Sequence, residues 1–126
     1  MSKVINTVGG GGSSKWQLVW TNASPTSSFA AQTIALDLSS FQEVQIVYRF
    51  STGDNAIVQN TQMINSGIGA AYFFQGFPSS GAIGARRRYA KATSTGILFE
   101  DAQNKSGTSA ASTDNDAMIP TLIYAR

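Results

Sequence analysis

The stretch of sequence that decides the fold is Val44-Gln-Ile-Val-Tyr-Arg-Phe50, near the middle of this 126-residue chain. Apolar side chains recur here at positions 44, 46, 48 and 50, while Gln45, Val47 and Arg49 occupy the positions between them. Alternate side chains of a β-strand point to opposite faces of the sheet. This period of two therefore predicts a strand with one face on a core.

The same period continues on both sides of this segment. Ile34, Leu36 and Leu38 alternate with polar or small residues, so residues 29–37 are expected to pair with 44–50 as a hairpin around 39–43. Trp16 and Trp20 have even spacing and are expected to share a face and pack in the core. Turn-forming stretches separate the apolar segments. We expect seven or eight strands, at residues 16–21, 29–37, 44–50, 57–64, 69–75, 82–92, 96–101 and 118–124.

These elements predict an all-β domain over residues 15–126, an antiparallel β-sandwich of the jelly-roll or immunoglobulin-like kind. Residues 9–14, Gly-Gly-Gly-Gly-Ser-Ser, precede it, and four consecutive glycines lose too much backbone entropy to form a strand interior. We therefore expect residues 1–14 to be an N-terminal arm on a glycine-rich tether. Its docking residues would be Lys3, Val4, Ile5 and Val8.

Composition argues against most enzyme mechanisms. The chain has no cysteine and no histidine, so it lacks a thiolate nucleophile, an imidazole base and the usual zinc ligands. Ser, Thr, Asn and Gln make up a third of the residues and charged residues only 13%, so hydroxyls and amides dominate the surface. No apolar run approaches the roughly 20 residues of a membrane span, and the first residues lack the apolar stretch of a signal peptide. We expect synthesis in the host cytoplasm without a signal peptide, and no membrane insertion.

The seven carboxylates offer the one remaining hydrolytic chemistry, since two facing acids suffice for a glycosidase. Glu100 and Asp101 are adjacent and would point to opposite faces of a strand, and Asp54 lies in a Gly-Asp-Asn turn. The Asp-Asn-Asp triplet at 114–116 lacks the glycine and terminal glutamate of an EF-hand. We expect no catalytic site, no metal and no cofactor, with a carboxylate hydrolase as the weakest alternative.

An aromatic run forms the first candidate contact site. Tyr72, Phe73, Phe74 and Phe77 are the densest group of rings in the chain. Neighbouring aromatics in a strand face both ways. They therefore belong either to a strand buried on both sides or to a surface that contacts a sugar or a neighbouring subunit.

Arg86, Arg87 and Arg88 form the second candidate site. Together with Lys91 they hold four of the nine positive charges, and on a strand Arg86 and Arg88 would share one face and Arg87 the other. One interpretation is a charged edge strand that discourages unwanted sheet pairing. The other is a contact with acidic groups on a neighbouring subunit. A nucleic-acid-binding protein would spread its basic residues over a larger footprint, so no nucleic-acid partner is expected.

Three segments resemble a known class of proteins. They are Ala-Leu-Asp-Leu-Ser-Ser-Phe-Gln-Glu-Val-Gln-Ile at 35–46, Thr-Gly-Ile-Leu-Phe-Glu-Asp-Ala at 95–102 and Met-Ile-Pro-Thr-Leu-Ile-Tyr at 118–124. Residues 16–126 resemble small β-sandwich structural proteins from the virions of tailed bacteriophages and prophages, whose last strand often reads Ile-Pro-x-x-Ile-Tyr-Gly. Here Ala125 stands at the position of that glycine. The resemblance implies a tail-fibre, baseplate or head-decoration component, commonly oligomeric and without an established catalytic set.

These observations lead to one functional expectation with two alternatives. We expect a non-enzymatic virion structural protein that forms a homo-oligomer, for example a trimer, in the tail or adsorption apparatus and docks on other virion proteins through its arm. The first alternative is a capsid decoration or head-fibre protein. The second is a carbohydrate-binding module for a bacterial surface glycan, with the 72–77 aromatics stacked on sugar rings.

Overall fold

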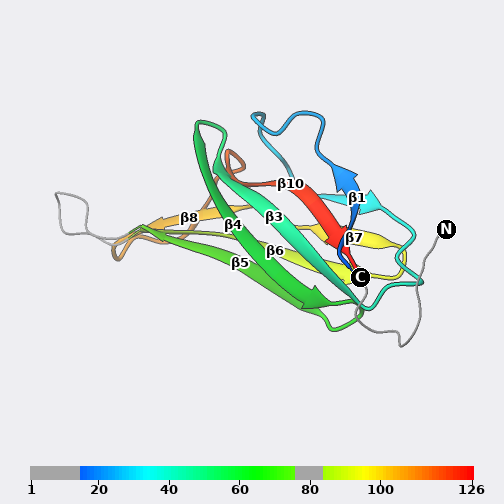
Figure 1. Cartoon of the computed structure of the whole chain (residues 1–126). Helices are drawn as coiled ribbons and strands as arrows, with labels where there is room; N and C mark the ends of the chain where they lie inside the picture. Colours follow the sequence, from blue (N-terminus) through cyan, green and yellow to red (C-terminus); the bar gives the residue numbers. More distant parts are fainter. Residues whose placement is uncertain (1–14, 76–83) are drawn as a thin grey trace.

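The structure is a computed structural model that describes residues 15–75 and 84–126 (Figure 1). The expected docking residues Lys3, Val4, Ile5 and Val8, and the aromatic Phe77, lie outside the described residues. The described part holds ten strands and no helix, and hence no helix that could cross a membrane. The strands are β1 (Gln17–Thr21), β2 (Gln32–Ala35), β3 (Glu43–Ser51), β4 (Asp54–Met63), β5 (Ile68–Gln75), β6 (Gly84–Thr93), β7 (Gly96–Phe99), β8 (Gln103–Ser106), β9 (Ser112–Thr113) and β10 (Ala117–Ala125).

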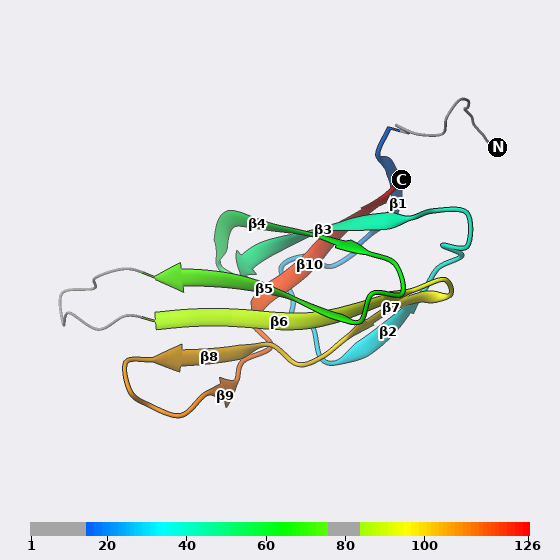
Figure 2. The same cartoon turned by 90° about the horizontal axis from the view of Figure 1, so that it is seen from below.

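The strands form two sheets that pack face to face (Figures 1 and 2). The first sheet has the order β1-β10-β3-β4, and the second has the order β2-β7-β6-β8-β9, with β5 paired to the free side of β6. Every pairing is antiparallel. The antiparallel β-sandwich predicted from the sequence is therefore confirmed.

The core follows the alternation in the 44–50 segment. Val44, Ile46, Tyr48 and Phe50 are all buried between the sheets, as predicted. Edge-to-face ring contacts extend from Tyr48 to Phe99 at 6.3 Å between centroids, and from Phe99 to Phe29 at 5.4 Å. Such contacts add to the stabilisation from apolar burial. They link the first sheet, the second sheet and the loop before β2.

The expected hairpin between residues 29–37 and 44–50 is wrong. Strand β2 is shorter than predicted and pairs with β7 in the second sheet, not with β3. Beyond β2 the backbone amides of Leu36 and Leu38 bond to carbonyls of the 94–95 turn. The following segment then crosses to the first sheet. Gly96 permits the close approach of β7 to the backbone of β2, because a Cβ at that position would lie 2.3 Å from the carbonyl oxygen of Ile34.

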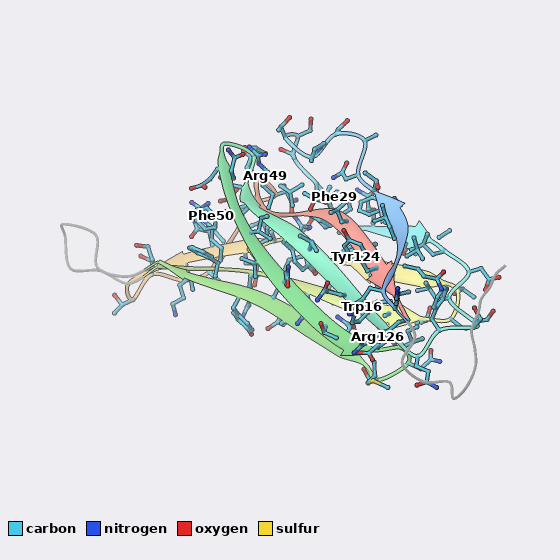
Figure 3. The ribbon with its side chains drawn as sticks, viewed as in Figure 1. Trp16, Phe29, Arg49, Phe50, Tyr124 and Arg126 are labelled. Carbon is cyan, nitrogen blue, oxygen red and sulfur yellow. The ribbon has the colours of Figure 1, made fainter. Side chains whose placement is uncertain are left out.

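The two tryptophans do not share a face. A register shift between Leu18 and Trp20 interrupts the alternation of β1, so that Val19 and Trp20 both pack against the core. Core packing is therefore confirmed for Trp20. Trp16 instead lies half-buried with the guanidinium of Arg126 4.3 Å from its ring centroid, at the end of the first sheet (Figure 3).

Strands β8 and β9 lie between the expected strands at 96–101 and 118–124, where the sequence predicts only a turn-forming stretch. The 103–113 segment is rich in Ser, Asn and Thr and shows no apolar alternation. It nevertheless forms strands because β8 completes the backbone hydrogen bonds of β6, pairing Arg87 with Gln103 and Ala85 with Lys105. At the margin of a sheet, backbone pairing suffices and an apolar face is not required.

Candidate functional site

The arginine strand β6 lies inside the second sheet. It pairs with β5 on one side and with β7 and β8 on the other, so the charged edge-strand interpretation is wrong. The register with β5 opposes Phe73 to Arg86 and Tyr72 to Arg87. Because side chains alternate, Arg86 and Arg88 share the core side of the sheet and Arg87 lies on the outer side.

Arg88 is fully buried and cannot contact a neighbouring subunit. Its Nε donates to the carbonyl of Met118 at 2.8 Å, and its Nη atoms donate to the carbonyls of Glu100 at 2.7 Å and Ala117 at 3.2 Å. Its guanidinium carbon also lies 5.2 Å from the centroid of the Phe29 ring. Burial lowers the pKa of Arg88 to about 10, which still leaves it protonated at neutral pH. It joins β6 to β10 and to the residue after β7.

Arg86 lies at the margin of the core. Its guanidinium carbon stacks 4.4 Å from the centroid of Phe50, and Phe50 in turn contacts Phe73 at 4.2 Å between centroids (Figure 3 labels Phe50). The buried Nε of Arg86 finds no hydrogen-bond partner within the described protein.

Arg87 is the centre of a group on the outer side of the second sheet, which we call the outer cluster: exposed Tyr72 and half-buried Arg87, Tyr89 and Gln103. Arg87 donates to the Gln103 side-chain oxygen from Nε at 2.8 Å and also from Nη2, and its guanidinium carbon lies 5.0 Å from the centroid of Tyr89. The hydroxyls of Tyr72 and Tyr89 lie 3.5 Å apart. That hydrogen bond lowers the pKa of Tyr72 and raises the pKa of Tyr89.

A shallow hollow of about 90 Å³ adjoins the outer cluster. Figure 2 shows the three strands that form it, β5, β6 and β8, side by side. Its accessible lining is mainly apolar, no carboxylate is among the described residues that line it, and six polar residues border it. These are Arg86, Arg87, Lys105, Gln103, Asn104 and Tyr72.

Glu43 and Asp101 are engaged away from the hollow, whereas the charge of Glu100 acts on Tyr89 in the outer cluster. Glu43 forms an ion pair with Arg126 at 3.1 Å, which is the only one in residues 15–75 and 84–126. Asp101 accepts hydrogen bonds from the Ala31 amide and from Asn115, which lower its pKa. No group of three potential metal ligands occurs in the described part of the chain.

The outer cluster contains one residue from each group predicted from the sequence. Tyr72 is 43% exposed, whereas Phe73 packs against the core. Phe74 pairs with Ala85 through the backbone. Tyr89 and Gln103 are not among the site residues predicted from the sequence. The alternation of Arg87 with Tyr89 along the strand could have indicated Tyr89. Gln103 comes beside Arg87 only through the pairing of β6 with β8.

Comparison with known proteins provides no assignment: no family model, curated protein or solved structure matches this chain. The fold and the site together define an antiparallel β-sandwich with an aromatic and basic surface on one sheet.

Proposed function

We propose that this chain is a non-enzymatic structural and attachment protein of the bacteriophage virion type, located in the tail or adsorption apparatus. In this proposal the β-sandwich assembles as a homo-oligomer and binds a bacterial surface glycan on its outer cluster. The observation that carries the proposal is the pair of exposed Tyr72 and half-buried Tyr89, held beside Arg87 and Gln103 on one sheet face. The resemblance of residues 35–46, 95–102 and 118–124 to virion sandwich proteins supports the virion context.

The chemistry of the outer cluster suits a sugar. Tyrosine rings offer apolar faces to the C–H groups of a pyranose and hydroxyls to its polar groups. The guanidinium of Arg87 and the amide of Gln103 are planar groups that already bond to each other, so little conformational entropy is lost when a ligand arrives. A flat sheet face also admits a long polymer, unlike an enclosed small-molecule pocket.

The opposite sheet supports assembly. Leu18 on β1 and Ile57 and Met63 on β4 are large apolar side chains that are more than half exposed. The second sheet also exposes Ile68 and Leu98, but the three side chains of the first sheet belong to its two outermost strands and support a subunit contact there. Assembly through the first sheet would leave the outer cluster of the second sheet available to a ligand.

Glycan binding is tested on an array of bacterial surface polysaccharides. The unchanged chain is expected to bind at least one polysaccharide class, and a Tyr72→Ala and Tyr89→Ala double variant is expected to lose that binding. Leu98→Ala, which truncates a side chain of the same 43% exposure on β7 of the same sheet, serves as the matched control and should still bind. Binding to no glycan, or binding that the double variant retains, would overturn the attachment role.

Assembly is tested by size-exclusion chromatography with light scattering. A symmetric oligomer is expected for the unchanged chain, and its dissociation is expected to shift to higher protein concentration in an Ile57→Ser and Met63→Ser variant. The Tyr72→Ala and Tyr89→Ala variant should keep the original mass. A strictly monomeric chain at all concentrations would contradict the assembly role.

A further inference from the structure

We infer that the hollow between β5, β6 and β8 selects acidic polysaccharides by seating a sugar carboxylate beside Arg87 and Lys105. This inference rests on the proposed function and specifies the ligand class of the same surface. It follows from the charge, the geometry and the size of the hollow.

The charge of the hollow is positive. Arg87 and Lys105 line it from the outer side of the sheet, whereas the guanidinium of Arg86 stacks on Phe50 on the core side, and neither Arg87 nor Lys105 forms an ion pair with a described carboxylate. Lys91 adds a third positive charge on the same outer side of β6, two residues beyond Tyr89. Cations held together in a concave site raise the local potential and attract anions. A neutral ligand would leave this repulsion unrelieved.

The geometry of Arg87 suits a carboxylate. Gln103 accepts hydrogen bonds from Nε and Nη2 and so holds the guanidinium plane in place against Tyr89. Arg87 also forms a side-chain hydrogen bond with Tyr72. Since a guanidinium has five N–H donors, further donors remain for a ligand. Charge-assisted bonds from arginine and lysine to carboxylates are among the strongest polar contacts in proteins.

The size of the hollow indicates a charged group carried on a larger molecule. A cavity needs at least about 10–15 Å³ to hold a single water, so about 90 Å³ accepts a group of several atoms but not an oligosaccharide. The remaining sugar rings would then lie on the open face beside Tyr72 and Tyr89. A carboxylate on a pyranose ring, as in a uronic acid, meets both requirements.

The experiment uses the full chain and isothermal titration with six-residue oligomers of galacturonate, glucuronate and mannuronate. The matched ligands are the methyl esters of the same oligomers, which keep the rings and lose the charge. At least one acid is expected to bind about tenfold or more tightly than its ester, as one lost charge-assisted contact corresponds to about that factor. Raising the salt concentration should weaken binding of the acid but not of the ester.

Single variants locate the effect. Lys105→Gln and Arg87→Gln are each expected to remove most of the preference for the acid over the ester. Lys15→Gln removes the same charge from an exposed position before β1, in the other sheet, and should leave the preference unchanged. Circular dichroism shows whether Arg87→Gln alters folding. Lys105 is exposed, so Lys105→Gln is expected to fold normally and can test the inference by itself.

The outcomes separate this inference from the proposed function. Equal binding of acids and esters, lost in the Tyr72→Ala and Tyr89→Ala variant, would overturn the inference and leave glycan attachment in place. Failure of the acids together with a blank polysaccharide array would overturn both. Tighter binding of a sulfated dextran than of every uronate, or of a 15-nucleotide oligothymidylate, would also overturn the inference and assign the hollow to sulfate or to nucleic acid.

Discussion

Replacing Arg88 by methionine should destabilise the sandwich strongly. The guanidinium lies fully inside the protein and donates to the backbone carbonyls of Glu100, Ala117 and Met118. Methionine fills a similar volume but donates no hydrogen bond. Arg88→Met therefore isolates the loss of these bonds from the loss of packing.

The magnitude follows from which carbonyls water can reach. Glu100 is exposed, so water can replace Arg88 at its carbonyl, whereas Ala117 and Met118 are completely buried. Leaving a buried acceptor unpaired costs about 1–3 kcal/mol, so two acceptors amount to about 2–6 kcal/mol. Removing the guanidinium also relieves its desolvation, which is the main cause of its lowered pKa. We expect a net loss of about 3 kcal/mol, a large part of the roughly 5–15 kcal/mol of a typical domain.

The assay is urea unfolding followed by tryptophan fluorescence and by circular dichroism. Arg88→Met should lower the midpoint without changing the slope. In thermal unfolding, the melting temperature should fall by roughly 10 °C. Lys91→Met, at an exposed position of the same strand, is the control and should stay within about 0.5 kcal/mol of the unchanged chain. A loss below about 1 kcal/mol for Arg88→Met would refute the reasoning that these carbonyls depend on Arg88.

Three further predictions concern stability. The buried hydroxyl of Tyr48 has no hydrogen-bond partner among the described residues, so Tyr48→Phe should be neutral or stabilising in urea unfolding; a loss above about 1 kcal/mol would reveal a partner. Gly96→Ala should cost about 2–4 kcal/mol in the same assay, because its Cβ would lie 2.3 Å from the Ile34 oxygen, whereas Gly53→Ala has open space and should be near neutral. The lowered pKa of Asp101 stabilises the fold above the ordinary carboxyl pKa, and this stability is lost as the pH falls through the folded value. Asp101→Asn should therefore show a smaller decrease of melting temperature from pH 7 to pH 2 than the unchanged chain, and an equal decrease would contradict the assignment.

The sequence predicts those strands of the sandwich that have one face buried in the core. The alternation from Val44 to Phe50 is sufficient because burial on one face imposes a period of two. Strands β8 and β9 carry no such period, since they are held by backbone pairing at the margin of the sheet. Sequence proximity was also misleading for β2. It pairs with β7 because the chain after Ala35 crosses from one sheet to the other, and no local pattern records such a crossing.

The candidate site was predicted only in part. Alternation correctly separated Arg87 from Arg86 and Arg88 on a strand. It could not show that the strand is central, because that depends on three partners from distant parts of the chain. Alternation also could not predict that Gln103 lies beside Arg87 and accepts its hydrogen bonds, because that contact depends on the register of β6 with β8.

The alternation of β6 also links stability to binding. Arg88 on the core side bonds to residues of β10 and to Glu100, and so fixes β6 against the opposite sheet. Its neighbour Arg87 on the outer side then has a fixed backbone from which to meet Gln103 and Tyr89. A planar guanidinium recognises a carboxylate only when its plane is held. Two adjacent arginines with the same chemistry thus have different surroundings, because the pleat directs one inward to backbone carbonyls and the other outward to Gln103 and Tyr89.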